Sequence, residues 1–184
     1  MTVANQKGVM LLEVMISLLI AAIALLGTVM MMTKSTRGEM ESYQRVQALT
    51  LVQDMVSRIN ANRGVATCYS NGATGIVTTA AIPTCTSGSA SEQAVANSDL
   101  AAWKSRILGA AERSGTSNVG AMIGAIGCVD EIDTLHQVFR VSVAWQGLMA
   151  TAAPALTCGQ GNYGNDDRLR RVVSVEVRIG DLSE

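Results

Sequence analysis

The chain of 184 residues has few aromatic residues, a single histidine and no block of basic residues. Aromatics make up only 3 %, so a globular core has to be built from Val, Ile, Leu, Met and Ala. Lys and Arg number 14 against 15 Asp and Glu. Because nucleic-acid binding relies on clustered basic side chains, no dedicated nucleic-acid surface is expected. One histidine, with no grouped nucleophile, predicts no catalytic triad, so no enzyme, cofactor or metal site is expected.

Charge is also missing from one long stretch near the N-terminus. No charged residue lies between Glu13 and Lys34. An apolar helix of about 20 residues crosses a bilayer, so residues 9–32 are predicted to be a membrane span. Lys7 precedes the span and favours a cytoplasmic N-terminus with the rest of the chain exported. Glu13 lies inside this span, where a carboxylate is costly, and so suggests a function.

Two ordinary membrane segments are alternatives. A cleaved secretory signal would use Ala22-Ile23-Ala24 as its small-residue cleavage site. Against this, Glu13 would lie in its apolar region, and the apolar run continues to Met32. An uncleaved signal anchor leaves Glu13 without a role.

The helix is predicted to continue past the membrane to about residue 62. No proline occurs between residues 34 and 62, and Gly64 is a plausible stop. At 100° per residue, one face carries the apolar side chains and the opposite face carries Asp54, Ser57 and Arg58. The apolar face consists of Ala48, Leu49, Val52, Met55, Val56 and Ile59. A helix over residues 9–62 would be roughly 80 Å long.

The remainder is predicted to be an α+β head. Residues 64–98 form an irregular connection with a short strand at 75–79. A helix over 99–113 is capped by Ser98 or Asp99, buries Leu100, Trp103, Ile107 and Ala111, and ends before Gly115. Strands are expected at residues 119–128, 137–146 and 171–179, the last two from apolar alternation. The apolar faces of the sheet and the long helix must cover each other.

Four cysteines occur at wide spacings, without a C-x-x-C pair. Zinc binding is therefore not indicated, and an even number on the exported side favours disulfides. Three pairings are possible. We favour Cys68–Cys85 with Cys128–Cys158, because each closes a local, loop-rich segment.

Other motifs are interpreted as structural. Residues 159–164 spell G-x-G-x-x-G but lack the strand before and helix after that a dinucleotide site needs, so a glycine-rich turn is expected. His136 is placed at a strand edge. Asp130, Glu131 and Asp133 lack EF-hand spacing and are interpreted as a solvated loop. The cluster of Arg168, Arg170 and Arg171 could contact DNA or a partner, but a solvated strand start is favoured.

Gly8-Val9-Met10-Leu11-Leu12-Glu13, followed by a long aliphatic helix, resembles the class III signal of type IV pilins and pseudopilins. Gly8, Leu11 and Glu13 match the family pattern, Leu12 is conservative, and Val9 and Met10 depart from it. The resemblance implies that a prepilin peptidase cuts after Gly8. Val9 would then be the N-methylated first residue, and Glu13 the fifth-position glutamate that sets assembly register. A disulfide-bounded loop near the C-terminus also recurs in such heads.

Within that class, residues 53–63, 98–104 and 141–145 resemble PilV-type minor pilins. The resemblance implies a leader (1–8), a transmembrane half-helix (9–32), an amphipathic half-helix (33–63) and a head (64–184). It also implies a single-pass inner-membrane protein with a periplasmic head that later joins the fibre. Expected partners are other major and minor pilins, the prepilin peptidase, the inner-membrane assembly platform and a possible tip adhesin. The alternatives are a minor pseudopilin of type II secretion, an exported membrane-anchored enzyme, and a DNA- or host-binding tip module.

Overall fold

The computed structural model describes residues 7–72, 75, 81–110, 113–118, 120 and 122–180. The chain divides into two compact units, Met1–Met40 and Glu41–Glu184. Helix α1 (Lys7–Ala61) supplies all that is described of the first unit and continues into the second. Its length agrees with the helix expected from the absence of proline.

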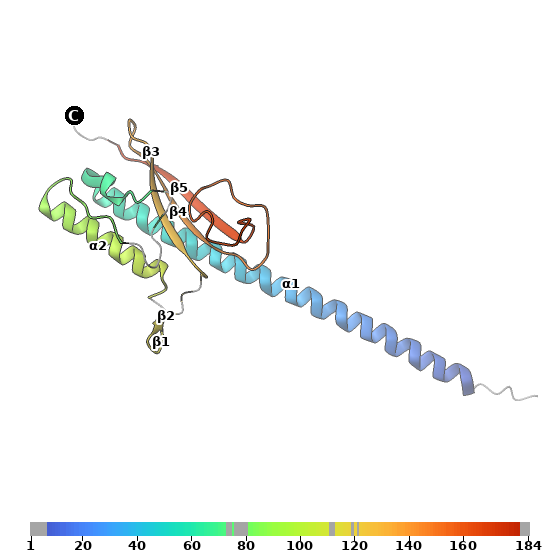
Figure 1. Cartoon of the computed structure of the whole chain (residues 1–184). Helices are drawn as coiled ribbons and strands as arrows, with labels where there is room; N and C mark the ends of the chain where they lie inside the picture. The colour runs from blue at the N-terminus through green and yellow to red at the C-terminus, as the bar shows by residue number, and fades with distance from the viewer. Residues whose placement is uncertain are drawn as a thin grey trace, which may run out of the picture. The chain divides into compact units, whose positions relative to one another are not determined.

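The second unit is an α+β head (Figure 1). After α1 come a 3₁₀ helix η1 (Arg63–Tyr69) and helix α2 (Ala90–Ile107). A two-stranded hairpin follows, formed by β1 (Arg113–Ser114) and β2 (Ser117–Asn118). The main sheet has three antiparallel strands in the order β3-β4-β5, namely β3 (Ile126–Asp133), β4 (Val138–Gln146) and β5 (Arg170–Arg178). The α+β class predicted from sequence is confirmed.

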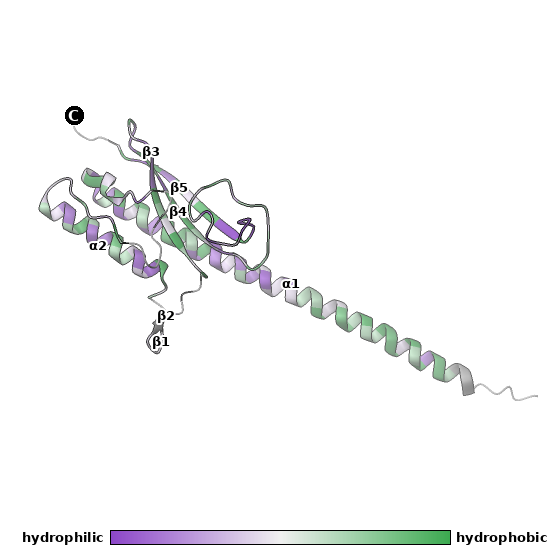
Figure 2. Ribbon diagram, viewed as in Figure 1, coloured by the Kyte–Doolittle hydropathy of each residue, from purple (hydrophilic) through white to green (hydrophobic). Residues whose placement is uncertain are grey.

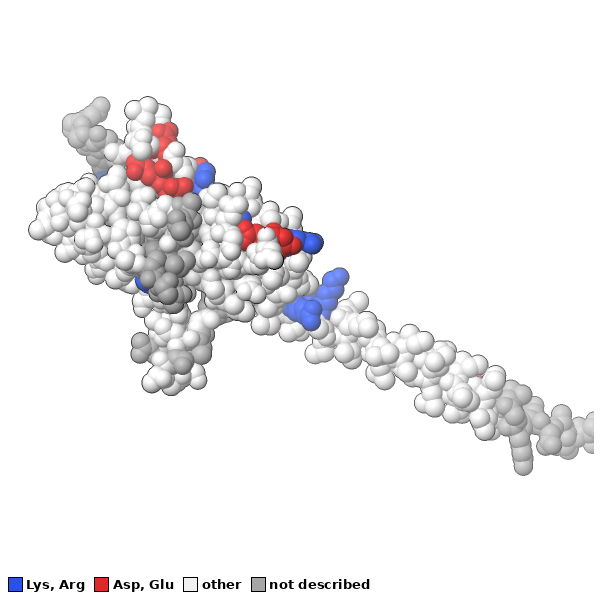
Figure 3. All heavy atoms as spheres, in the orientation of Figure 1, with Lys and Arg blue, Asp and Glu red and all other residues white. Residues whose placement is uncertain are grey.

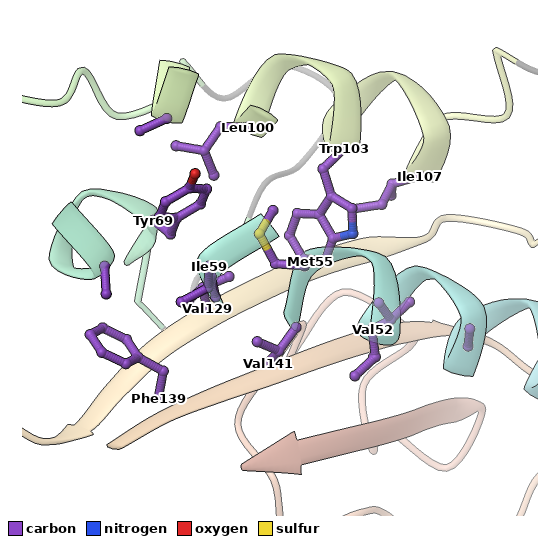
Figure 4. Packing of buried hydrophobic residues seen from close by; sticks show 14 of the residues in the cluster. Val52, Met55, Ile59, Tyr69, Leu100, Trp103, Ile107, Val129, Phe139 and Val141 are labelled. Atoms are coloured by element: carbon purple, nitrogen blue, oxygen red, sulfur yellow. The ribbon is translucent and has the colours of Figure 1, made fainter. Parts of the chain in front are cut away.

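The C-terminal part of α1 packs between α2 and the sheet (Figure 4). Four of the six positions predicted from the helical period are fully buried, namely Ala48, Val52, Met55 and Ile59, and Val56 is partly buried. From α2, the ring of Trp103 lies beside Met55, and Ile107 lies on the other side of that ring (Figure 4). The sheet contributes Val129, Phe139, Val141, Val143 and Trp145. Leu49, expected on the buried face, is 36 % exposed because it lies at the margin of that face.

The face of α1 that was expected to be solvated is partly covered by α2. Arg58 donates to Asp54 at 3.1 Å and also pairs with Asp99 of α2 at 2.5 Å. Arg106 of α2 pairs with Asp54 at 3.0 Å. Burial alone would lower the pKa of Arg58, but the bonds to both carboxylates raise it. These charges therefore join two helices.

Two predicted element positions are wrong. Helix α2 begins at Ala90 rather than 99, because Ser89 and Glu92 form a capping box there. Residues 90–97 carry few large apolar side chains, so their sequence gives little helical periodicity. The helix ends at Ile107, and the backbone turns at Gly109 (φ 70°), whereas Gly115 lies in the β1–β2 turn.

The first strand of the sheet begins later than predicted. The prediction placed it at residues 119–128, but β3 runs from Ile126 to Asp133. Asp130, Glu131 and Asp133 therefore belong to a strand and not to a loop. The predicted strand at 75–79, apart from Gly75, and Ala111 lie outside the described residues.

Candidate functional site

The apolar part of α1 is the first candidate functional segment. Residues 10–32 are exposed along their whole length, and α1 is the one described helix that is long and apolar enough to cross a membrane. Figure 2 shows this part of the helix almost wholly in the hydrophobic colour. In Figure 3 it is nearly free of charged atoms on the face shown. The segment therefore has the surface of a lipid-exposed helix or of a helix that packs against other apolar helices.

Hydroxyl groups in this segment bond to their own helix. Ser17 Oγ donates to the carbonyl of Glu13 at 2.8 Å, and Thr28 Oγ1 to that of Leu25 at 2.8 Å. Directly after the segment, Thr33 Oγ1 donates to the carbonyl of Val29 at 2.9 Å. Because hydrocarbon offers no hydrogen-bond partners, this internal pairing suits an apolar environment. It leaves Glu13 as the single charged side chain of residues 10–32.

Glu13 is exposed on α1 among apolar side chains. Its neighbours on the helix include Met10, Val14 and Ile16, which are 74 %, 56 % and 48 % exposed. The backbone of Gly8 and Val9 belongs to the first turns of the same helix. The predicted cleavage at Gly8–Val9, the methylation of Val9 and the register role of Glu13 remain predictions.

Two disulfides connect the head. Cys68 pairs with Cys85 across 17 positions, and Cys128 with Cys158 across 30. This is the pairing favoured from sequence. The first joins η1 to the segment before α2, and the second ties the loop of residues 147–169 to β3.

The loop of residues 147–169 is held by hydrogen bonds from Arg170, which is 1 % exposed. Its guanidinium donates to the carbonyl of Cys158 at 2.9 Å, to that of Pro154 at 3.0 Å, and to that of Leu156. Arg170 Nε lies 3.3 Å from Asp167 Oδ2. Arg170 is therefore a structural residue, and its predicted place in a basic surface cluster is wrong.

Arg171 is also engaged within the head. It is 17 % exposed, lies 3.2 Å from Glu41 of α1, and donates to the carbonyl of Met149 at 2.7 Å. Glu41 also accepts from the backbone N–H of Leu148 at 3.1 Å. Only Arg168 of the three arginines is largely exposed, at 59 %. With two of its three members enclosed, the cluster offers little basic surface to DNA.

The glycine-rich segment 159–164 is a turn, as predicted. Both carboxylate oxygens of Asp167 accept the backbone N–H of Gly161, at 3.0 and 2.9 Å. Tyr163 is buried and donates its hydroxyl to the carbonyl of Gly124 at 2.6 Å. Burial raises the pKa of Tyr163. The segment thus closes a loop and has neither the strand nor the helix of a dinucleotide site.

The turn between β3 and β4 contains His136. The ring Nδ1 of His136 lies 2.7 Å from Asp133 Oδ2, and its backbone N–H donates to Asp133 Oδ1 at 3.1 Å. Both bonds lower the pKa of Asp133, and the bond to the His136 ring has the larger effect. No group of three or more metal-ligating side chains occurs among the described residues.

Sequence reasoning missed Glu41, Asp167 and the buried role of Arg170. Their partners are mainly backbone groups of an irregular loop, and such contacts leave no periodic pattern. The one signal available was the adjacency of two aspartates to three arginines at 166–171.

Comparison with known proteins gives one family match. Residues 31–101 match the family model described as Tt1218-like, Type IV pilin Tt1218. No curated protein and no solved structure matches the chain. The matched segment contains the second half of α1, η1 and the first part of α2. It supports the type IV pilin superfamily for this chain, whose long helix and disulfide-linked antiparallel sheet are consistent with the α+β fold of type IV pilins.

Proposed function

We propose, from the premise that residues 31–101 resemble a type IV pilin, that the chain is a minor pilin. It acts in the initiation or at the tip of a type IV pilus, in the manner of PilV-type subunits. Residues 1–8 are the leader and 9–32 the membrane and fibre-core helix. Residues 33–63 join that helix to a periplasmic head formed by 64–184. The partners are other pilins, the prepilin peptidase, the assembly platform and a tip adhesin.

One observation carries the proposal: an exposed apolar helix with a single carboxylate precedes a disulfide-linked head. In an assembled fibre this helix surface is covered by the helices of neighbouring subunits. Glu13 would then be removed from water and would need a cation. The N-terminal amine of Val9, created by cleavage after Gly8, is such a cation in the adjacent subunit.

The pairing gives a physical basis for correct register. Removing one partner of a buried ion pair costs about 3–5 kcal/mol, because a buried charge is left uncompensated. A subunit shifted along the axis would separate Glu13 from the amine of its neighbour and incur this cost. Glu13 therefore selects one axial position while contributing little to membrane insertion.

The test compares Glu13→Ala with Ser17→Ala, a control change one helical turn away. Both variants are expected in the inner-membrane fraction at the wild-type level, because each replaces a polar side chain of the span by alanine. Fibres counted by electron microscopy should be lost or sharply reduced with Glu13→Ala and unchanged with Ser17→Ala. Normal piliation by Glu13→Ala would refute the register role.

Processing is tested separately by mass spectrometry of the mature N-terminus, in cells with and without the prepilin peptidase. A chain that begins at methylated Val9 only when the peptidase is present supports the pilin assignment. A chain that begins at Leu25 indicates a secretory signal. An intact Met1 in both strains indicates a plain anchor.

A further inference from the structure

Strand β5 forms an edge of the main sheet (Figure 1). Two backbone hydrogen bonds, one just beyond each end of the β4–β5 pairing, show which backbone groups of β5 face away from β4. Gly147 N–H donates to the carbonyl of Leu169 at 2.8 Å, and Ile179 N–H to that of Gln137 at 3.0 Å. Odd-numbered residues of β5 therefore bond to β4, and even-numbered ones direct their N–H and C=O groups away from it.

The outward groups belong to Val172, Ser174, Glu176 and Arg178. Within the described part of the chain, none of these N–H or C=O groups has a hydrogen-bond partner. An unpaired row of this kind is a template for another strand. Proteins usually protect such an edge with proline, charged side chains, a bulge or a covering segment. Strand β5 carries charged side chains, among them Glu176 and Arg178, but it contains no proline, and its pairing with β4 has no register shift.

At the opposite edge of the sheet, outward backbone groups of β3 are hydrogen-bonded by another segment of the chain. The N–H groups of Asn71 and Gly72 donate to the carbonyl of Val129 on β3, at 2.9 and 3.0 Å. Asn71 Oδ1 accepts the N–H of Val129 at 2.8 Å. A register shift also interrupts β3 between Glu131 and Asp133. The chain thus covers and distorts one edge and leaves the other regular.

The side chains of β5 define what could lie beside it. On the face towards α1, Val173 is 9 % exposed but Val175 is 37 % exposed, so the apolar face is incompletely covered near the edge. On the other face, Glu176 is paired with Arg140 at 2.8 Å. Arg178 is exposed and has no ion-pair partner among the described residues.

We infer that β5 accepts an extended segment of a separate polypeptide as a fourth, antiparallel strand of the sheet. The segment has apolar side chains at alternate positions, which cover Val175 and Val177, and a carboxylate beside Arg178. Backbone bonds to Ser174, Glu176 and Arg178 provide the affinity, and the alternating side chains provide the selectivity. This inference goes beyond the proposed function and does not depend on it.

The test uses the full chain in detergent micelles and the acetylated peptide Asp-Val-Thr-Val-Thr. In antiparallel register its aspartate lies opposite Arg178 and its valines lie on the α1 side. Saturable shifts are expected in the NMR amide signals of Ser174, Glu176 and Arg178. A control peptide that is N-methylated at the central threonine loses the N–H that faces Glu176 and should bind at least about tenfold more weakly.

Variants of the chain provide a second control. Ser174→Pro removes an outward N–H that makes no bond within the head, so the fold should persist while peptide binding falls about tenfold or more. Ser174→Thr keeps that N–H and should bind as the wild type does. Arg178→Glu should weaken binding about threefold to fivefold, and a peptide with lysine in place of aspartate should restore it.

Three results would overturn the inference. The first is the absence of saturable shifts in the β5 amides at the solubility limit of the peptide. The second is equal binding of the N-methylated peptide or by Ser174→Pro. The third is a shift of the same amides with protein concentration alone, because the occupant would then be a second copy of this chain.

Discussion

The indole N–H of Trp103 donates to the backbone carbonyl of Leu51 across 2.9 Å, joining α2 to α1 inside the core. Trp103 is fully buried. A Cβ atom on Gly127 of β3 would come within 2.5 Å of its ring and 2.3 Å of Ile107. The ring is therefore held between a helix carbonyl and a strand that has room for glycine only. This contact fixes the distance between α2 and the sheet.

Gly127→Ala should destabilise the head by about 1–3 kcal/mol, because the added methyl group overpacks the core against Trp103. Chemical denaturation followed by tryptophan fluorescence measures the loss. Gly180→Ala is the matched control, since a Cβ there meets nothing within 4 Å, and its stability should stay near wild type. In the Gly127→Ala background, Trp103→Leu should cost less than it does alone. Strict additivity of the two changes would contradict the contact.

The sequence predicted those elements whose burial follows a period. The buried positions of α1 and the alternation of β4 and β5 depend on repeats of 3.6 and 2 residues, and both repeats are visible in the chain. The start of α2 depends instead on one capping interaction, Ser89 with Glu92. The burial of Arg170 depends on hydrogen bonds to carbonyls of an irregular loop. Neither interaction produces a periodic pattern in the sequence, so the predicted start of α2 and the predicted exposure of Arg170 are wrong.

Ser89→Ala should reduce the free energy of unfolding by about 1 kcal/mol, because the capping box of α2 is lost. Its side chain accepts from Glu92 N–H, and Glu92 accepts from Ser89 N–H at 2.8 Å. The hydrogen bond from the Ser89 hydroxyl lowers the pKa of Glu92 most, and the bond from the Ser89 backbone N–H lowers it further. The variant should therefore raise the pKa of Glu92 in an NMR titration. Ser105→Ala, exposed within the same helix, should change neither quantity. An unchanged Glu92 pKa in Ser89→Ala would contradict the capping role.

The Asp133 carboxyl should titrate below its ordinary pKa of 3.8, because His136 bonds to it through both ring and backbone. A lowered pKa in the folded state means that the carboxylate stabilises the turn fully above pH 3.8. That contribution is lost as the pH falls through the lowered value. Carbon-detected NMR titration measures the midpoint. In His136→Ala the midpoint should rise towards 3.8, whereas Thr134→Ala should leave it in place.

Arg170→Lys should release the loop of residues 147–169 even though the positive charge is kept. A single ammonium group cannot reach the carbonyls of Pro154, Leu156 and Cys158 together with Asp167, and the planar guanidinium does. Asp167 is 8 % exposed, and an ammonium group that bonds to the carbonyls would leave its carboxylate without a paired charge. Disruption of such a buried pair costs about 3–5 kcal/mol.

The loss should be measured in two ways with both disulfides intact. Denaturation gives the change in unfolding free energy, and limited proteolysis locates new cleavage between residues 148 and 157. Arg168→Lys is the control, because Arg168 is 59 % exposed and its pair with Asp166 spans 4.0 Å, so the change should stay below about 1 kcal/mol. If Arg170→Lys resists protease as well as Arg168→Lys does, the loop is held by the Cys128–Cys158 disulfide alone. Selective cleavage in Arg170→Lys would show that the buried guanidinium, and not the disulfide by itself, keeps the loop folded.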